Sequence, residues 1–252
     1  MEDPQPRYRQ LAGLLRDAIE AGEYPPGSML PSEPDIGTRY GVSRDVVNKA
    51  VRSLRTQGLV RVVRGRGTMV REIPPIRRNA VARYQQAARE RAGGRGAFDS
   101  EVRALGMEPR SDTDVATIPA PPDVAAALGL EPGSPVVRRD RHMYANDVPV
   151  QIAPSYIPAD IAEGTPLAAL DSGPGGIVSR FADLGYRQVR ITESVRARPA
   201  TEEERAFLQL DADQPVIEIW HTGWTEEGRP VELAVHVAPA SLWILDYEFA
   251  VG

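Results

Sequence analysis

Residues 28–70 read SMLPSEPDIGTRYGVSRDVVNKAVRSLRTQGLVRVVRGRGTMV, and this stretch decides how the rest of the chain is organised. Its pattern predicts a helix, a tight turn, a second helix and then a two-stranded β-ribbon. Ser32 is placed to cap the first helix, and Asp35 follows it at the spacing of a capping box. Ser43 can cap the second helix, and Gly58 ends it. The stretch therefore predicts two short helices followed by a hairpin.

The second predicted helix has an apolar side and a polar side. Its apolar residues recur at the spacing of a buried stripe, and they are Val47, Ala50, Val51 and Leu54. The opposite side and its flanks carry Arg44, Asp45, Asn48, Lys49 and Arg52. A helix with a buried stripe and a polar, basic start is what the major groove of DNA accepts.

Composition limits the classes of protein to consider. The chain has 252 residues and 42% hydrophobic residues, which is enough for one large or two small domains with a core. It has no cysteine, so disulfides, thiolate metal sites and cysteine nucleophiles are excluded. No apolar run approaches membrane-spanning length, and the N-terminal residues MEDPQP lack a signal-peptide pattern. We expect a soluble, cytoplasmic protein with no membrane partner.

The net charge of −5 hides an asymmetry along the chain. Residues 1–78 hold 14 Lys and Arg against 9 Asp and Glu, a balance of +5, whereas the remaining residues have a balance of −10. A basic segment joined to an acidic one indicates that only the first segment meets nucleic acid. The alternative is a basic surface that is merely solvated.

The N-terminal stretch resembles the winged helix-turn-helix domain of GntR-type bacterial transcription regulators. The matching segments are PPGSMLPSE (25–33), YGVSR (40–44) and LRTQGLVRVVRGRGT (54–68). The resemblance implies that Arg44 contacts DNA and that Gly65, at the wing tip, approaches the minor groove. The sequence departs from the family pattern at Pro34 and Asn48, and at the Asp45-Val46 pair, so an operator sequence cannot be carried over.

Pattern and resemblance together give a predicted DNA-binding surface for double-stranded operator DNA. Arg64 and Arg66 could reach phosphates or the minor groove from the wing. An ordinary hairpin with solvated arginines is the alternative. The predicted DNA-binding residues are Glu33, Ser43, Arg44, Asp45, Asn48, Lys49, Arg52, Arg64, Gly65 and Arg66.

After this domain, assigned to residues 1–73, the pattern predicts a linker over 74–96 and a second domain over 97–252. Two consecutive prolines begin the linker, and its remainder is polar and rich in arginine. The second domain alternates strands with short helices, which favours an antiparallel α+β fold. Predicted strands span 112–118, 135–144, 148–157, 188–197, 215–224 and 230–237, and predicted helices span 122–128, 175–184 and 201–208.

The second domain resembles the UTRA ligand-binding domain of the HutC branch of GntR regulators. Matching segments are VVRRDRHMYANDVPV (136–150), SYIP (155–158), SVRARPATEEE (194–204) and EEGRPVE (226–232). The resemblance implies a chorismate-lyase-like α+β fold and a small-molecule effector held by this domain.

The resemblance also implies which residues bind the effector: Phe98, Asp99, Arg139, Arg141, Gln151 and Glu232. Arg139 and Arg141 are two apart on one strand, so their side chains share a face and can reach one anion. Cross-strand salt bridges are the alternative for this pair. Asp99 would repel a phosphate and could be the internal partner of the two arginines, which favours a carboxylate or polar metabolite.

We expect no cofactor and no metal site. His142, His221 and His236 lie on three predicted strands, where a lone histidine is usually structural, and no catalytic triad or phosphate-binding glycine motif occurs. The hypothesis is a homodimeric, effector-responsive transcription regulator, most simply a repressor. An effector-independent repressor of plasmid transfer or maintenance, and an enzyme with a lyase-like second domain, are the alternatives.

Overall fold

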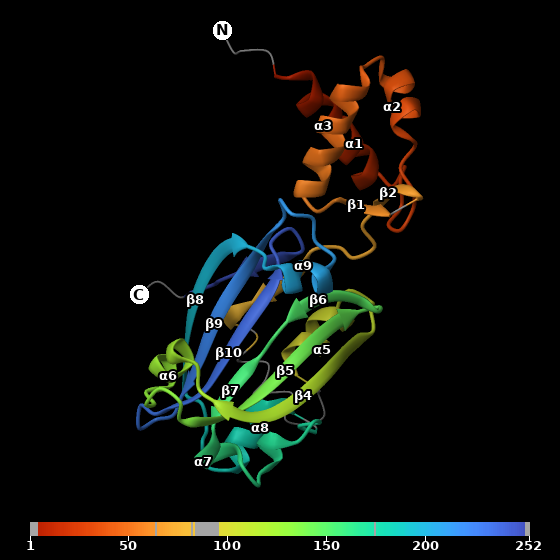
Figure 1. Cartoon of the computed structure of the whole chain (residues 1–252). Coiled ribbons are helices and arrows are strands. Elements are labelled where there is room, and N and C mark those ends of the chain that lie inside the picture. The colour runs from red at the N-terminus through yellow and green to blue at the C-terminus, as the bar shows by residue number, and fades with distance from the viewer. Residues whose placement is uncertain (1–4, 64, 82, 84–95, 174, 250–252) are drawn as a thin grey trace. The chain divides into compact units, whose positions relative to one another are not determined.

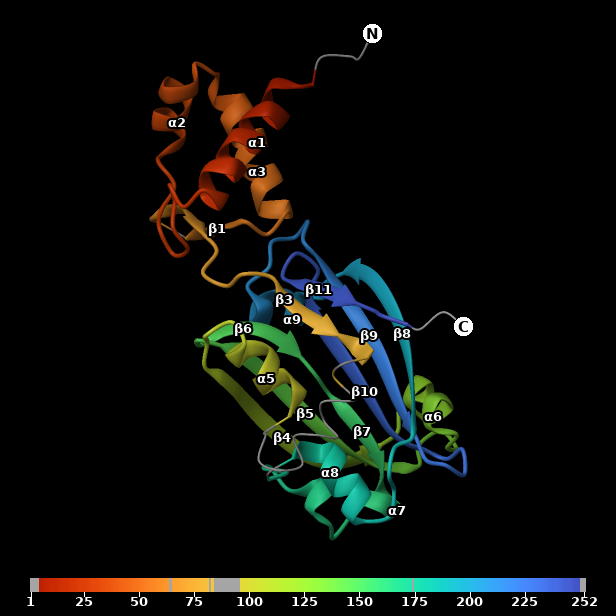
Figure 2. The same ribbon diagram turned by 180° about the vertical axis from the view of Figure 1, so that it is seen from behind.

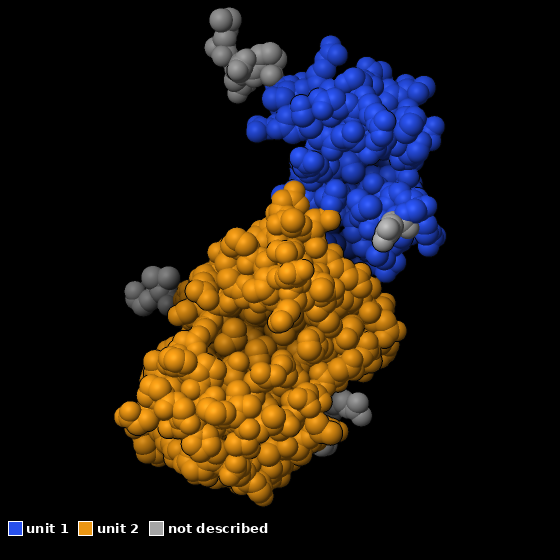
Figure 3. Space-filling view, in the orientation of Figure 1, with its two compact units in different colours: residues 1–75 blue, residues 76–252 orange. Residues whose placement is uncertain are grey.

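The computed structural model describes residues 5–63, 65–81, 83, 96–173 and 175–249 (Figure 1). The chain divides into two compact units, residues 1–75 and residues 76–252, which are coloured separately in Figure 3. The expected linker therefore already contains structure of the second unit, because residues 76–79 form strand β3 (Ile76–Asn79). This strand pairs in parallel with β11 (Trp243–Asp246). The two strands are so far apart in the sequence that no local pattern predicts their pairing.

Three helices form most of unit 1: α1 (Arg7–Glu20), α2 (Glu33–Tyr40) and α3 (Arg44–Thr56). The predicted caps are confirmed, since Ser32 Oγ accepts from the amide of Asp35 and Ser43 Oγ accepts from the amide of Val46. The predicted stripe of α3 is buried against residues of α1 and α2. Burial of this stripe is the main force holding the three helices together, because each apolar side chain leaves water.

The wing of unit 1 is a two-stranded antiparallel ribbon of β1 (Val60–Val63) and β2 (Gly67–Val70). Val60 pairs with Val70, and Val62 pairs with Thr68, which confirms the predicted β-ribbon. Gly65 has φ of +75°, a left-handed conformation that glycine adopts without steric cost, and it turns the ribbon at its tip. Arg64 lies outside the described residues.

Unit 2 is built on one seven-stranded antiparallel sheet, which confirms the predicted α+β class. Six strands follow the order β4-β5-β6-β10-β9-β8, and β7 pairs with both β5 and β10. The strands are β4 (Pro109–Pro119), β5 (Pro135–Ala145), β6 (Val148–Ile152), β7 (Ser155–Pro158), β8 (Arg190–Pro199), β9 (Pro215–Trp224) and β10 (Pro230–Pro239).

The chain between β5 and β7 contains a tight turn and a break in the predicted strand. Asn146 and Asp147 both have positive φ, as expected for the tight turn between β5 and β6. The predicted single strand over 148–157 is wrong, because the chain leaves the ladder at residues 153–154 and re-enters as β7. Pro154 carries no amide hydrogen and cannot continue a ladder, which accounts for the break.

The two faces of the sheet are covered differently (Figures 1 and 2). On one face, α6 (Pro122–Leu128) packs against residues of β5 and β10, and α9 (Glu202–Leu208) packs beside β6. The other face carries the β3–β11 pair and α5 (Ala97–Arg103), seen in front of the sheet in Figure 2. At one end lie α7 (Ala159–Ala162), a 3₁₀ turn (Pro166–Ala168) and α8 (Gly176–Asp183).

Candidate functional site

The predicted DNA-binding residues of α3 begin at an exposed helix start. The side chain of Arg44 is 82% exposed, and its Nε lies 3.5 Å from a carboxylate oxygen of Glu33 in α2. The side-chain amide of Asn48 is oriented so that its nitrogen donates to both carboxylate oxygens of Glu33, at 2.8 and 2.6 Å. Glu33 therefore connects the start of α2 to two side chains on the exposed face of α3.

Those of the remaining predicted DNA-binding residues that the structure describes are also on the surface of unit 1. Lys49 and Asp45 form an ion pair of 2.8 Å one helical turn apart, and Arg52 is exposed further along α3. Gly65 and Arg66 are exposed at the tip of the wing. The arrangement gives unit 1 an exposed polar helix face and an exposed ribbon tip.

Unit 2 contains a cavity of about 820 Å³. The six predicted effector-binding residues, Phe98, Asp99, Arg139, Arg141, Gln151 and Glu232, all line it. Phe98 and Asp99 belong to helix α5. The other four come from strands β5, β6 and β10, and the segment leading into α8 closes another part of the wall.

Arg139 is buried, at 4% exposure, and its guanidinium is held by main-chain carbonyls. It donates to the carbonyl oxygens of Leu167 at 3.0 Å and Leu170 at 3.2 Å, and also to that of Ala169. Burial lowers the pKa of Arg139, an effect that the charges of Glu232 and Asp171 partly offset. Arg139 thus fixes the segment 167–170 against the sheet.

Arg141 is engaged less completely. Its Nε donates to the carbonyl of Ala153 at 3.0 Å, and burial lowers its pKa to about 10, so it stays protonated at neutral pH. Within the described residues, neither Arg139 nor Arg141 forms an ion pair, so the cross-strand salt bridges considered as the alternative are not found. Both arginines use carbonyl acceptors, and within the described residues no ion pair joins either of them to Asp99.

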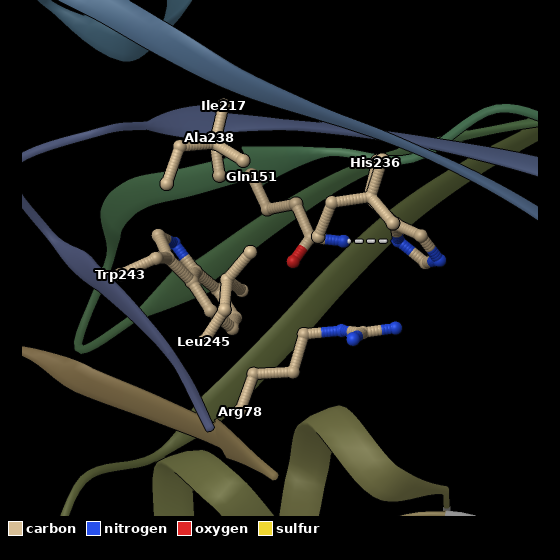
Figure 4. A pocket seen from close by; sticks show the side chains of 8 residues that line it. Arg78, Gln151, Ile217, His236, Ala238, Trp243 and Leu245 are labelled. Carbon is tan, nitrogen blue, oxygen red and sulfur yellow. Dashed lines mark hydrogen bonds between the residues drawn. The ribbon is translucent and has the colours of Figure 1, made fainter. Parts of the chain in front are cut away.

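The polar side of the cavity includes two buried residues on β10. Glu232 is buried and accepts from Nε2 of Gln188 at 2.9 Å. His236 Nδ1 accepts from Nε2 of Gln151 at 2.7 Å, which is the dashed line in Figure 4. Burial, and then the nearby charges of Arg83 and Arg78, place the pKa of His236 well below its usual value, so the ring is neutral. A neutral ring that accepts at Nδ1 carries its proton on Nε2.

An ionic network beneath the β3–β11 pair was not predicted from the sequence. Arg78 of β3 is 2% exposed and grips the Glu193 carboxylate with both terminal nitrogens, one of them at 3.0 Å. His221 Nδ1 and the Tyr247 hydroxyl also approach Glu193, at 3.4 and 3.3 Å. Figure 4 shows Arg78 on the same side of the sheet as His236. Arg78 follows two prolines in a polar segment, a context that predicts an exposed side chain. Its burial follows from the pairing of β3 with β11, which the sequence does not indicate.

The histidines do not form a metal site in the described part of the chain. The rings of His221 and His236 are 6.2 Å apart, and both residues line the cavity. His142 stacks edge-on against Phe207 of α9. Among the described residues, no group of three or more His, Asp or Glu is arranged to hold a metal ion.

The two units match two known families. Residues 7–70 match the bacterial regulatory proteins of the gntR family, and residues 104–242 match the UTRA domain. The chain therefore belongs to the GntR-family helix-turn-helix transcription regulators that carry a UTRA domain. No helix within the described residues is both long and apolar enough to span a membrane.

Individual relatives agree with this assignment over nearly the whole chain. An uncharacterized HTH-type transcriptional regulator of Streptomyces coelicolor is 33% identical, covering 100% of this chain and 95% of its own. The HTH-type transcriptional repressor NagR of Bacillus subtilis is 28% identical, covering 94% and 91%. The crystal structure of PhnF from Mycobacterium smegmatis has a TM-score of 0.60 and covers 96% and 99%; at 20% identity this likeness concerns the fold.

Proposed function

We propose that the protein is a homodimeric, cytoplasmic transcription repressor with a ligand-controlled affinity for its operator. Unit 1 binds operator DNA, and a small polar or anionic effector in the cavity of unit 2 lowers that affinity. The single observation that carries the proposal is the cavity, which gathers buried charged side chains in a domain family joined to a DNA-binding domain.

The DNA-binding half of the proposal rests on exposure and charge. Arg44 lies at the start of α3 with most of its side chain in solvent, and Arg66 is exposed at the wing tip. A helix whose first turn reads base edges and a wing that meets the backbone are a known way of combining specificity and affinity. Residues 1–78 also have a net charge of +5, whereas the remaining residues have a net charge of −10.

The effector half rests on the electrostatics of unit 2. A buried charge without a compensating partner is costly, so a protein retains one where it has a task or a partner. Arg141 keeps its charge at neutral pH inside the cavity wall and has only a carbonyl as a described partner. A bound acceptor group would satisfy it.

Repression and dimerisation follow the logic of operator recognition. A two-fold symmetric dimer places two equal helices on two half-sites of a near-palindromic operator. An effector that favours one dimer geometry over another then changes DNA affinity. The name of the Bacillus subtilis relative, a transcriptional repressor, supports this direction of control.

A three-part experiment on the full chain tests the proposal. Sedimentation equilibrium should give twice the chain mass of 27.5 kDa. Binding-site selection from random duplexes should return a near-palindromic site. A library of small carboxylates, phosphates, amines and amino acids should contain a compound that releases the protein from that site. A monomer on DNA, or a selection that returns no sequence preference, would refute the corresponding part.

A further inference from the structure

Two oppositely charged side chains line the cavity without pairing with each other. Arg141 comes from β5 and Glu232 from β10, and each belongs to the lining of the same cavity. They are close enough for the charge of Glu232 to act on Arg141, whose pKa it raises against the lowering by burial. Within the described residues, however, no ion pair joins them. Both side chains therefore remain open to a third group in the cavity that they line.

Each member of this pair has unused hydrogen-bonding capacity. Arg141 donates through Nε to the Ala153 carbonyl, and its hydrogen bonds to described residues end there. Glu232 accepts through Oε2 from Gln188, a neutral amide. The two terminal nitrogens of Arg141 and Oε1 of Glu232 remain for an occupant of the cavity. A ligand that pairs with both groups makes two charge-assisted hydrogen bonds inside the cavity, so such a ligand is favoured.

The other cations of the cavity lining are already engaged by the protein. Arg139 is held by the carbonyls of the segment 167–170. Arg83 is gripped by the Glu101 carboxylate at 2.8 and 2.9 Å. Arg110 is paired with Asp112 and with Asp147. Of the charged groups in the described lining, half-buried Arg141 and buried Glu232 are thus the oppositely charged pair best placed to meet a ligand.

From this balance we propose that the cavity takes a zwitterion, a small molecule with an anionic group for Arg141 and an ammonium group for Glu232. The proposal rests on the proposed function and narrows its ligand class. A simple anion would pair with Arg141 but would be repelled by the Glu232 carboxylate. A simple amine would pair with Glu232 but would be repelled by Arg141. The ligand class is an amino carboxylate, whose two charged groups complement the two side chains.

The first test uses matched probes on the full chain. Amino carboxylates with three to six carbons and an α- or ω-amino group are compared with the carboxylate and the amine of the same carbon number, and with phosphate monoesters. Calorimetric titration should find an amino carboxylate that binds about tenfold more tightly than both of its matched compounds, because each charge-assisted bond is lost in one of them. Equal or tighter binding of a carboxylate or a phosphate overturns the proposal.

The second test removes the acidic partner. Glu232→Gln keeps an oxygen that can accept from Gln188 but lacks the charge, so the preference for the amino carboxylate over its matched carboxylate should fall from about tenfold to near one. Glu232→Asp keeps the charge and should retain a preference. Glu131→Gln makes the same chemical change on an exposed carboxylate outside the cavity lining and should change nothing. Thermal melting of each variant verifies folding.

The outcomes separate this inference from the function on which it rests. If a singly charged compound or a phosphate releases the protein from its operator at the same or a lower concentration than any amino carboxylate, the zwitterion proposal fails and the effector-controlled regulator stands. If no compound of any class changes operator affinity, the effector part of the proposed function fails as well. If Glu232→Gln keeps the full preference for the amino carboxylate, Glu232 is not the ammonium partner and the proposal is overturned.

Discussion

A carboxylate oxygen of Glu33, the first residue of α2, lies 3.5 Å from Nε of Arg44, the first residue of α3. This relationship ties the exposed arginine of one helix to the start of the other. We predict that Arg44→Ala weakens operator binding by about 1–3 kcal/mol if the arginine reads a base. Fluorescence anisotropy at fixed salt measures the change. Arg16→Ala removes an exposed arginine of α1 and is the matched control; an equal loss in both variants would contradict a specific role for Arg44.

The wing arginine should behave as a phosphate contact. Arg66→Ala should lower affinity for all duplexes similarly and reduce the slope of log affinity against log salt by about one unit, because one fewer counterion is released. Titrations at several salt concentrations give the slope. Arg187→Ala, an exposed arginine of unit 2, should leave it unchanged. An altered base preference with an unchanged slope would assign Arg66 to base reading instead.

The ion pair of Arg78 and Glu193 should contribute strongly to the stability of unit 2. Both side chains are nearly inaccessible, at 2% and 9% exposure, so Arg78→Met leaves a buried carboxylate without its cation. We expect a loss of about 3–5 kcal/mol in the free energy of unfolding. The three tryptophans all lie in unit 2, so their fluorescence during urea denaturation reports on this unit. Asp160→Asn breaks an exposed pair with Arg229 and should cost less than about 1 kcal/mol.

His236 predicts a pH dependence of stability. The unfolded chain takes up a proton on this histidine near pH 6.5, whereas the folded chain does so only at much lower pH. The unfolded state therefore binds more protons below about pH 6.5, and the free energy of unfolding falls as the pH drops, by up to about 1.4 kcal/mol per pH unit. Urea midpoints between pH 7.5 and 5 measure this, and His236→Gln should flatten the curve. An unchanged curve in the variant would assign the effect to other groups.

We predict that Arg139 has a structural role and that Arg141 binds the ligand. Arg139→Ala releases three main-chain carbonyls of the segment 167–170 and should destabilise unit 2 by about 2–3 kcal/mol. Arg141→Ala removes one bond to a carbonyl and should mainly abolish binding of the amino carboxylate found by calorimetry. Melting temperature and calorimetry on both variants decide between the roles. Loss of binding in Arg139→Ala with unchanged stability would reverse the assignment.

Local signals predicted much of this molecule. The caps at Ser32 and Ser43 and the buried stripe of α3 each depend on a few neighbouring residues, and all are present in the structure. The cavity also gathers the six residues that the family resemblance indicated, although their role in binding stays a prediction.

The features that sequence did not reveal depend on distant partners. Gln188 meets Glu232 and Arg78 meets Glu193 only because segments far apart in the chain are brought together. Arg139 looked like a ligand residue, but its acceptors are main-chain carbonyls, which carry no side-chain signature. Helix α5 is not among the predicted helices, because it is only seven residues long and has no side-chain cap.

The pairing of β3 with β11 also sets the order in which the chain can fold during synthesis. Arg77 of β3 and Asp246 of β11 hydrogen-bond although they are 169 positions apart. Unit 1 has all of its elements once about seventy residues have left the ribosome, whereas β3 must wait for the last strand to emerge. Contacts of such long sequence separation form late. During synthesis, unit 1 would therefore be folded while the side chain of Arg78 is still exposed, because β11 has not yet been made.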